Sequence, residues 1–294
     1  MSFAGKRFNH AQLLESVSRS FYLSIKFLPR EMREPVSTGY LLARLTDTIA
    51  DSGEIPLQSR TDALNRLAEH IETLNFDCNF AEFVPAVSHP GEQILLRSTS
   101  EVIERLASNT PENREAIRKV LGTIIEGQKW DLARFPNQNA KLSDEELLRY
   151  TWQVAGCVGE FWTEVGFLNL GSKFAAEEDR RLMLASGKKL GQGLQLINII
   201  RDLHEDVPAG RHYLPDDDIR RWLSVCRDFL NDGKQYVRKV RHRKVKFATA
   251  LPLYLAEATA DRLEEAGEAE IRRKKIKVPR STVWKMAIRA ALFP

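Results

Sequence analysis

The chain has 294 residues, of which 43% are hydrophobic and 29% are charged, and its formal net charge is +4. This composition is typical of a globular protein with a large core, and it excludes collagen-like, low-complexity and disordered chains. The mild positive charge does not by itself indicate nucleic-acid binding, although anionic ligands or an anionic membrane surface would suit it.

Apolar residues recur at helical spacing through most of the chain, whereas the alternation typical of strands is almost absent. The pattern predicts helices, in chain order, over residues 11–25, 31–52, 59–75, 91–108, 112–133, 143–169, 176–206, 216–243, 246–266 and 280–292. Ser143 and Glu146 predict a capping box at the start of the sixth helix. No linker or repeat interrupts the chain, so we expect one all-α domain, residues 1–294.

Three widely spaced cysteines, Cys78, Cys157 and Cys226, indicate a reducing compartment and argue against both a disulfide framework and a zinc site. The N-terminal residues lack the apolar run of a secretory signal, and no stretch reaches the roughly 20 apolar residues that cross a bilayer. We therefore expect a cytoplasmic protein that does not span a membrane.

The pattern Asp-x-x-x-Asp occurs three times, as Asp47/Asp51, Asp202/Asp206 and Asp228/Asp232. Two aspartates so spaced share a helix face and repel each other by up to ~0.5 kcal/mol unless a cation intervenes. Such carboxylates suit Mg²⁺, a hard ion that keeps water ligands and bridges to substrate phosphates. Because a chain of this length contains such a pair by chance, the surrounding residues must separate functional pairs from bland ones.

The pair at 228 and 232 lies in a charged segment that runs into Gly233, so we interpret it as a solvated surface pair. The pair at 47 and 51 follows an apolar run, with Arg44 on the same face, which is equally consistent with a plain ion pair. On the helix before residue 206, a polar stripe on an otherwise apolar helix indicates a cavity wall, and it consists of Gln195, Asn198, Asp202 and Asp206. Together the two acidic stripes form a candidate clamp for diphosphate and Mg²⁺.

Five segments resemble, in the same order, the motifs of the squalene and phytoene synthase family. The two acidic segments, Asp47–Asp51 and Asn198–Asp206, resemble its signature motifs. The other three are SRSF (18–21), VAGCVG (154–159) and GRHYLP (210–215). The similarity runs from about residue 14 to 290. The resemblance implies an isoprenoid-synthase-type helical bundle around a central cavity.

Within the family, Thr48, the Gln195–Asp202 segment and the Pro252–Thr259 segment resemble squalene synthases. The resemblance implies a Mg²⁺-dependent prenyltransferase of isoprenoid (sterol or hopanoid) biosynthesis. It would join two farnesyl diphosphates head to head, through presqualene diphosphate, and reduce the product with NADPH to squalene. The alternatives are a phytoene or dehydrosqualene synthase, and a presqualene diphosphate synthase without reduction. From other classes, a non-catalytic helical assembly factor and a basic RNA-binding protein are alternatives, but both acidic motifs are present, and base-stacking aromatics are missing from the basic stretches.

The resemblance also assigns candidate site residues. Mg²⁺ would be held by Asp47, Asp51, Asp202 and Asp206. Diphosphate or cofactor phosphates would be bound by Arg19, Arg44 and Arg201, and NADPH by Lys275 and Lys277, although a solvated basic face is the alternative for the lysines. Substrate contacts are expected from Ser18, Ser20, Phe21, Gln195 and Asn198. Pocket-lining aromatic rings are expected from Phe21, Tyr22, Trp152, Phe161 and Trp162.

Two positions depart from the family pattern. Ala50 stands where an acidic residue is common, and Gln153 replaces a tyrosine that precedes the Val-Ala-Gly segment. Tyr150 as a base and Trp152 as a ring facing the carbocation are the candidates for the missing function, with the diphosphate itself as base in either case. The expected partner is farnesyl diphosphate and not nucleic acid, and a peripheral contact with the inner membrane is the expected route of product release.

Overall fold

The computed structural model describes residues 9–18, 21–135 and 141–292, and within these ranges the chain forms helices and no β-strand. Arg19 and Ser20 lie outside the described residues. The α-helices are α1 (His10–Ser18), α2 (Phe21–Lys26), α3 (Arg30–Ala50), α4 (Leu57–Thr73), α5 (Pro90–Arg97), α6 (Thr99–Ala107), α7 (Pro111–Arg134), α8 (Asp144–Thr151), α9 (Cys157–Leu170), α10 (Arg180–Asp206), α11 (Ile219–Lys239), α12 (Arg243–Ala266), α13 (Glu268–Ile271) and α14 (Arg280–Leu292). The prediction of an all-α fold is confirmed.

Short non-α turns complete the list: η1 (Ala81–Ala86), η3 (Gly171–Lys173) and η4 (Glu177–Asp179) are 3₁₀ turns, and η2 (Trp152–Gly156) is a π-helical turn. The predicted capping box is confirmed, because the Ser143 hydroxyl accepts from the Glu146 N–H and the Glu146 carboxylate accepts from the Ser143 N–H. None of the described helices is both long and apolar enough to cross a membrane.

Two predicted helices are wrong in their extent, and a third has the predicted extent but not regular α-helical geometry throughout. The helix expected over residues 91–108 is broken at Ser98, whose backbone (φ −105°, ψ 23°) leaves helical geometry. The helix expected over 216–243 ends at Lys239, because Val240 is extended and buried and the Arg241 N–H donates to the Phe174 carbonyl at 2.7 Å. The helix expected over 143–169 contains the π turn η2, which often marks a functional site.

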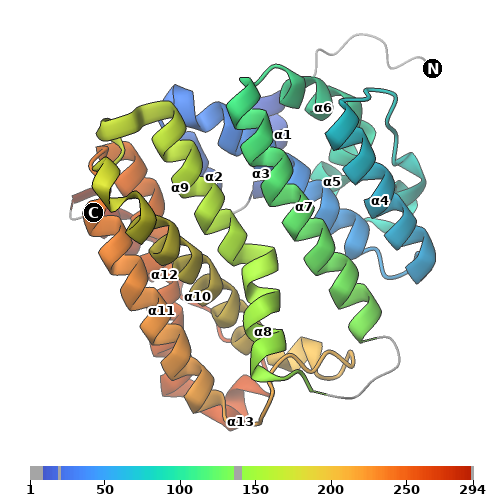
Figure 1. Ribbon diagram of the computed structural model, residues 1–294. Coiled ribbons are helices and arrows are strands. Elements are labelled where there is room, and N and C mark those ends of the chain that lie inside the picture. The colour runs from blue at the N-terminus through green and yellow to red at the C-terminus, as the bar shows by residue number, and fades with distance from the viewer. Residues whose placement is uncertain (1–8, 19–20, 136–140, 293–294) are drawn as a thin grey trace.

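The main helices lie side by side, so that α3 contacts α7, α7 contacts α9, α9 contacts α10, and α10 contacts α11 and α12 (Figure 1). Their buried apolar side chains form two clusters, one mainly between α1 and α7 with α9, the other mainly between α8 and α10 to α14. Burying a Leu or Ile side chain contributes about 1.5–3 kcal/mol, so these faces fix the helices against one another. The candidate site lies where the two clusters meet.

The contact of η2 and α9 with α10 is unusually close because small residues face each other. A Cβ added to Gly191 would lie 2.2 Å from the Ala155 carbonyl oxygen, and one added to Gly159 would lie 1.9 Å from the Gly187 oxygen. No side chain fits at such distances. The Val-Ala-Gly-Cys-Val-Gly segment therefore brings the backbone of α9 directly against the helix that carries the second acidic pair.

We expect Gly191→Ala to destabilise the protein by roughly 1–3 kcal/mol or more, because its Cβ would force two backbones apart. Urea denaturation would measure the change. Gly122→Ala in α7 is the matched control: no atom lies within 4 Å of its added Cβ, so the gain in helix propensity, about 1 kcal/mol, should stabilise the protein. A Gly191→Ala protein as stable as the wild type would contradict the packing described here.

Candidate active site

Two pockets adjoin at the junction of the hydrophobic clusters. The polar pocket has a volume of about 750 Å³ and lies between α3, α4, α7, α8 and the turn after α10. The apolar pocket has a volume of about 390 Å³ and lies between α3, α7, α9, α10 and α12. Asp47, Val154 and Gln195 line both pockets. One ligand with a charged end and an apolar chain therefore fits across the junction.

The first acidic pair lies at the C-terminal end of α3. The Gln128 side-chain amide donates to Asp47 Oδ1 at 2.7 Å, and Arg44 Nη1 lies 3.9 Å from Asp47 Oδ2. The Asp47 side chain is 47% accessible and lines the pocket, so the surrounding helices remove part of its solvation. Burial, together with the neighbouring carboxylate of Asp51, raises the pKa of Asp47 to about 7.

Arg44 does not line either pocket. Its guanidinium is bound by Glu92 of α5 in a part-buried ion pair, so it holds α5 against α3. The pocket instead contains Arg60 and Arg211. Arg60 Nη1 donates to the Ala50 carbonyl at 2.7 Å and closes the end of α3. Burial raises the pKa of Asp51, while Arg211 and Arg44 lower it.

The second acidic pair lies at the end of α10. Arg201 donates to Asp202 at 3.0 and 2.6 Å, and Lys275 Nζ lies 2.9 Å from Asp202 and 3.3 Å from Glu205. Burial opposes the charge of Asp202, but these hydrogen bonds outweigh it and hold its pKa below the ordinary range. Arg201 and Lys275, which we expected to bind phosphates, are thus engaged with protein carboxylates.

Asp206 differs from Asp202. Burial raises the pKa of Asp206 to about 6, and the charges of Asp202 and Asp131 add to the effect, while Arg211 opposes it. The Arg211 N–H also donates to the Asp206 carbonyl at 2.9 Å, which fixes the turn after α10.

Asp131 of α7 is a site residue that no sequence motif indicated. The Tyr213 hydroxyl donates to Asp131 Oδ1 at 2.7 Å, and the Tyr150 ring stacks on Tyr213 with centroids 5.2 Å apart. Burial raises the pKa of Asp131, and the charge of Asp51 raises it further. The charge of Asp131 in turn raises the pKa of Asp206. Asp131 therefore links the two acidic pairs. The GRHYLP segment, which supplies Arg211 and Tyr213, was the available signal.

Tyr150 lines the polar pocket, and its hydroxyl is hydrogen-bonded with Tyr213. Burial raises the pKa of Tyr150 well above its ordinary value, so the phenol stays protonated and is not suited to act as a base. Trp152 lies outside both pockets: its indole N–H donates to Glu160 at 2.9 Å and its ring lies under Lys188. The expected ring facing the pocket is not found at Trp152, because Glu160 of α9 and Lys188 of α10 hold that side chain away from both pockets.

The apolar pocket has aromatic walls from α2, α3 and α9. Phe21 stacks on Tyr40 at 5.8 Å and meets the edge of Trp162 at 6.4 Å. The pocket is lined by several of the expected residues, namely Phe21, Phe161, Trp162, Gln195 and Asn198. Tyr22 does not line it. The Ser18 hydroxyl is buried and donates to the Leu14 carbonyl within α1.

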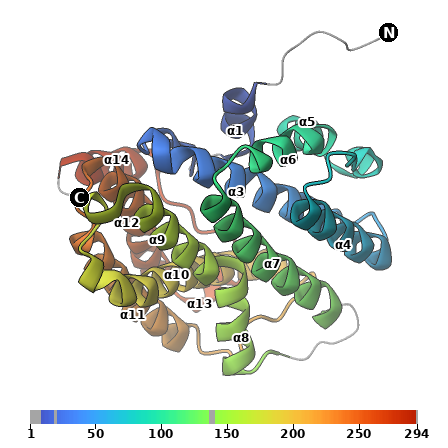
Figure 2. The same ribbon diagram turned by 45° about the horizontal axis from the view of Figure 1, so that its top comes forward.

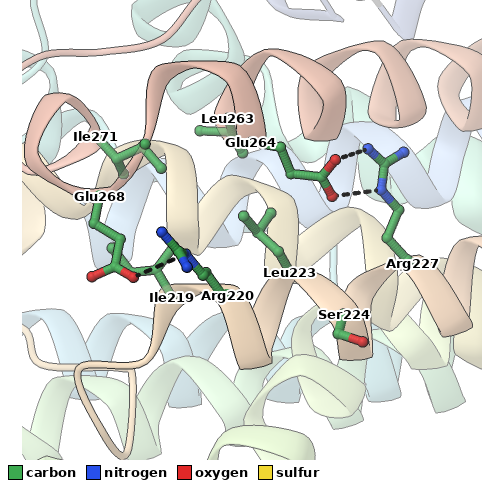
Figure 3. Close-up of a pocket in the computed structure, with 10 residues that line it drawn as sticks. Ile219, Arg220, Leu223, Ser224, Arg227, Leu263, Glu264, Glu268 and Ile271 are labelled. Carbon is green, nitrogen blue, oxygen red and sulfur yellow. Dashed lines mark hydrogen bonds and ion pairs between the residues drawn. The ribbon is translucent and has the colours of Figure 1, made fainter.

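The remaining acidic pair lies on the surface, as predicted. Asp228 is exposed, and Asp232 forms an ion pair with Lys189 at 2.8 Å. A separate groove between α11, α12 and α13 is also charged at its rim (Figure 3). Its charges are already paired, Arg227 with Glu264 and Arg220 with Glu268 (Figure 3). The two carboxylates of that groove are therefore each neutralised by a guanidinium.

We expect Arg211→Gln to lower the free energy of unfolding of the metal-free protein by about 1–3 kcal/mol, a value discounted for partial exposure. The pKa of Asp206 is raised from 3.8 to about 6. Its ionised form therefore lowers the free energy of unfolding by the full amount above pH 6 and by nothing below pH 3.8. The loss in the variant should therefore shrink as the pH falls through 6. Denaturation with a chelator present at several pH values would measure it.

The control is Arg66→Gln, which removes an exposed ion pair with Glu82 and should cost under about 1 kcal/mol at any pH. A loss in Arg211→Gln that grows on acidification would contradict the assigned role.

The sequence of this chain is similar to those of known proteins. The family model for squalene/phytoene synthases matches residues 14–225. The squalene synthase of Schizosaccharomyces pombe is 31% identical over 222 residues, 74% of this chain and 46% of the relative. The bifunctional lycopene cyclase/phytoene synthase of Phaeosphaeria nodorum is 27% identical over 214 residues, 71% of this chain and 33% of the relative. The chain thus spans less than half the length of these two relatives.

Solved structures share the fold. A ligand complex of TcSQS has a TM-score of 0.80 and 22% identity, covering 96% of this chain and 85% of the other. A dehydrosqualene synthase in complex with a ligand has a TM-score of 0.66 and 18% identity, covering 96% and 93%. The predicted isoprenoid-synthase-type fold is confirmed. From the match over residues 14–225 and the two adjoining pockets, we conclude that the chain belongs to the squalene/phytoene synthase family.

Proposed function

We propose that this protein is a squalene synthase that joins two molecules of farnesyl diphosphate through presqualene diphosphate and reduces the product to squalene. The observation that carries the proposal is the junction of a carboxylate-lined polar pocket with an apolar pocket at Asp47, Val154 and Gln195. A diphosphate with metal ions suits the first pocket, and a prenyl chain suits the second.

The residues of the polar pocket fit Mg²⁺. No three His, Cys, Asp or Glu side chains converge on one point within the described part of the chain, so the protein alone does not complete a ligand cage. Mg²⁺ ordinarily takes one or two carboxylates and fills its shell with water and phosphate oxygens. Gln128 offers a buried Oε1 without a partner beside Asp47, and it can accept a hydrogen bond from a bound water. Asp47 and Asp51 of the pocket would hold the ions together with Asp202 and Asp206, which lie at the end of α10 outside the lining of both pockets.

In the proposed reaction, Arg60 and Arg211 face the leaving diphosphate and stabilise its charge. Mg²⁺, when bound, supplies Lewis-acid stabilisation of the same charge. The protonated Tyr213 donates a hydrogen bond to Asp131, and Tyr150 is hydrogen-bonded with Tyr213, so the two phenols keep Asp131 oriented. Because neither phenol is a suitable base, the departed diphosphate takes up the proton that the carbocation loses. The rings of Phe21, Phe161 and Trp162 exclude water from the carbocation.

The two lysines expected to bind NADPH differ in their surroundings. The ammonium of Lys275 is paired with Asp202 and Glu205, so it does not fit as a free cation for a cofactor phosphate. Lys277 is exposed and forms no ion pair with any described carboxylate, so it fits better. The engaged Lys275, with a phytoene synthase among the relatives and a dehydrosqualene synthase among the structures, keeps the non-reductive reaction as the second candidate.

We expect Asp47→Asn to lower turnover of farnesyl diphosphate by about 100-fold or more, because one metal ligand is lost. The same change should raise the thermal stability of the metal-free protein, since it removes a repelling charge from a shielded site. Product release would be followed by chromatography, and melting by calorimetry with and without Mg²⁺. Asp228→Asn is the control and should match the wild type in both. Normal turnover in the Asp47 variant would refute the assignment.

We expect NADPH to change the product: presqualene diphosphate or its solvolysis products without it, squalene with it. Lys277→Glu should impair only the reductive half-reaction. Lys275→Glu should impair both halves, because it also removes the partner of Asp202. Product identification by mass spectrometry separates the cases. The same dehydrogenated hydrocarbon with and without NADPH would establish the non-reductive reaction instead.

A further inference from the structure

The C-terminal helix α14 has two apolar faces. Val283, Met286, Ala287 and Ala290 turn toward the body of the protein, and Ala290 is fully buried. Arg289 lies 4.1 Å from the centre of the Tyr254 ring and ties α14 to α12. Figure 2 shows α14 at the edge of the molecule beside α12. The inner face of α14 is therefore packed against the rest of the protein.

The outer face carries large apolar side chains. Trp284, Ile288 and Leu292 are 69%, 58% and 64% exposed. Their spacing of four residues places them in one stripe along the helix. Single exposed apolar residues are ordinary on a protein surface. An aligned stripe that contains a tryptophan is instead typical of an interaction surface.

The charged residues around the stripe indicate which kind of partner binds it. From Ile271 to Leu292 every charged residue is basic, namely Arg272, Arg273, Lys274, Lys275, Lys277, Arg280, Lys285 and Arg289. On the helical wheel, Arg280 lies at one edge of the apolar stripe, and Lys285 and Arg289 lie at the other. Neither Arg280 nor Lys285 forms an ion pair with any carboxylate of the described residues. An apolar stripe bordered by cations is the pattern of helices that lie flat in a membrane interface.

We propose that α14 docks on the surface of a bilayer containing anionic phospholipids. Trp284, Ile288 and Leu292 enter the boundary between headgroups and acyl chains, while Arg280 and Lys285 contact lipid phosphates. An RNA partner would not use the apolar stripe, and a second copy of this chain would bring like charges together across the helix.

Helix α14 is connected to the apolar pocket through α12. The helix α12 contacts both α14 and α2, and it lines that pocket with Ala248, Thr249 and Pro252. Near this wall, Phe27 is 47% exposed and packs against Phe247 of α12 at 5.2 Å. Docking would therefore place a wall of the apolar pocket close to lipid. Its use for passing an apolar product to the bilayer rests on the proposed function, but the docking itself does not.

The test is flotation of the purified full chain with vesicles, in the absence of substrate. We expect binding to vesicles of phosphatidylcholine and phosphatidylglycerol, weaker binding to phosphatidylcholine alone, and release by high salt. The double variant Trp284→Ser/Ile288→Ser should bind about tenfold more weakly or worse. Lys285→Glu should weaken binding to the anionic vesicles only. Quenching of tryptophan fluorescence by brominated lipid should be smaller in Trp284→Phe than in the wild type.

The matched control is Ile94→Ser/Leu182→Ser, since these side chains are 51% and 52% exposed on other helices. It should float like the wild type, and all variants should keep the wild-type melting temperature and the same turnover without vesicles. Turnover that fails in every protein, wild type included, would count against the proposed function and leave vesicle binding intact. The docking is overturned if the wild type does not float, if the α14 variants float as well as it does, or if ultracentrifugation finds a dimer that these variants abolish.

Discussion

The site depends on the repulsion among carboxylates that three helices bring into and beside the polar pocket. Asp51, at the end of α3, and Asp131 of α7 line this pocket, whereas Asp206 of α10 lies outside its lining, and burial raises the pKa of each. Arg211 acts on all three in the opposite direction. Taking charges out of water costs several kcal/mol per ion unless they are compensated. The guanidinium of Arg211, on the turn after α10, is therefore the counter-charge that all three carboxylates share, and Arg44 and Arg60 add to it at Asp51.

The two acidic pairs are not equivalent in this arrangement. Asp202 is held ionised by Arg201 and Lys275, whereas Asp47 has only an amide donor and a distant guanidinium, and its pKa rises to about 7. The α3 side of the pocket thus has more to gain from a bound cation than the α10 side. Lys275 also joins the basic C-terminal segment to the second acidic pair, so the chain after α12 takes part in the site from outside the pocket.

Close backbone packing sets the shape of the pockets. Since α9 and η2 approach α10 at glycines, there is no room for side chains between them, and apolar space is left on the side facing α3 and α7. The π turn directs Val154 into both pockets, while Gln153 packs its Cβ region against Gly127 of α7. The position where the family has a tyrosine therefore does not line a pocket in this chain, and the phenols of Tyr150 and Tyr213 occupy the polar side.

The sequence by itself determined the helical class, the acidic pairs at 47/51 and 202/206, the bland pair at 228/232 and the family. These depend on residues within a turn or two of one another, and helical periodicity reports such local spacing directly. It also predicted the capping box, which is a contact over three residues.

Only the tertiary structure decided which side chains share the pocket. Asp131 meets Tyr213, and Arg44 meets Glu92, across long stretches of chain that no local pattern connects. Arg44 and Trp152 were expected in the site, yet each binds another protein side chain, because α5 lies against α3 and the start of α9 places Glu160 beside residue 152. A side chain's neighbours follow from how helices pack, and packing is a property of faces that meet in space and not of spacing along the sequence.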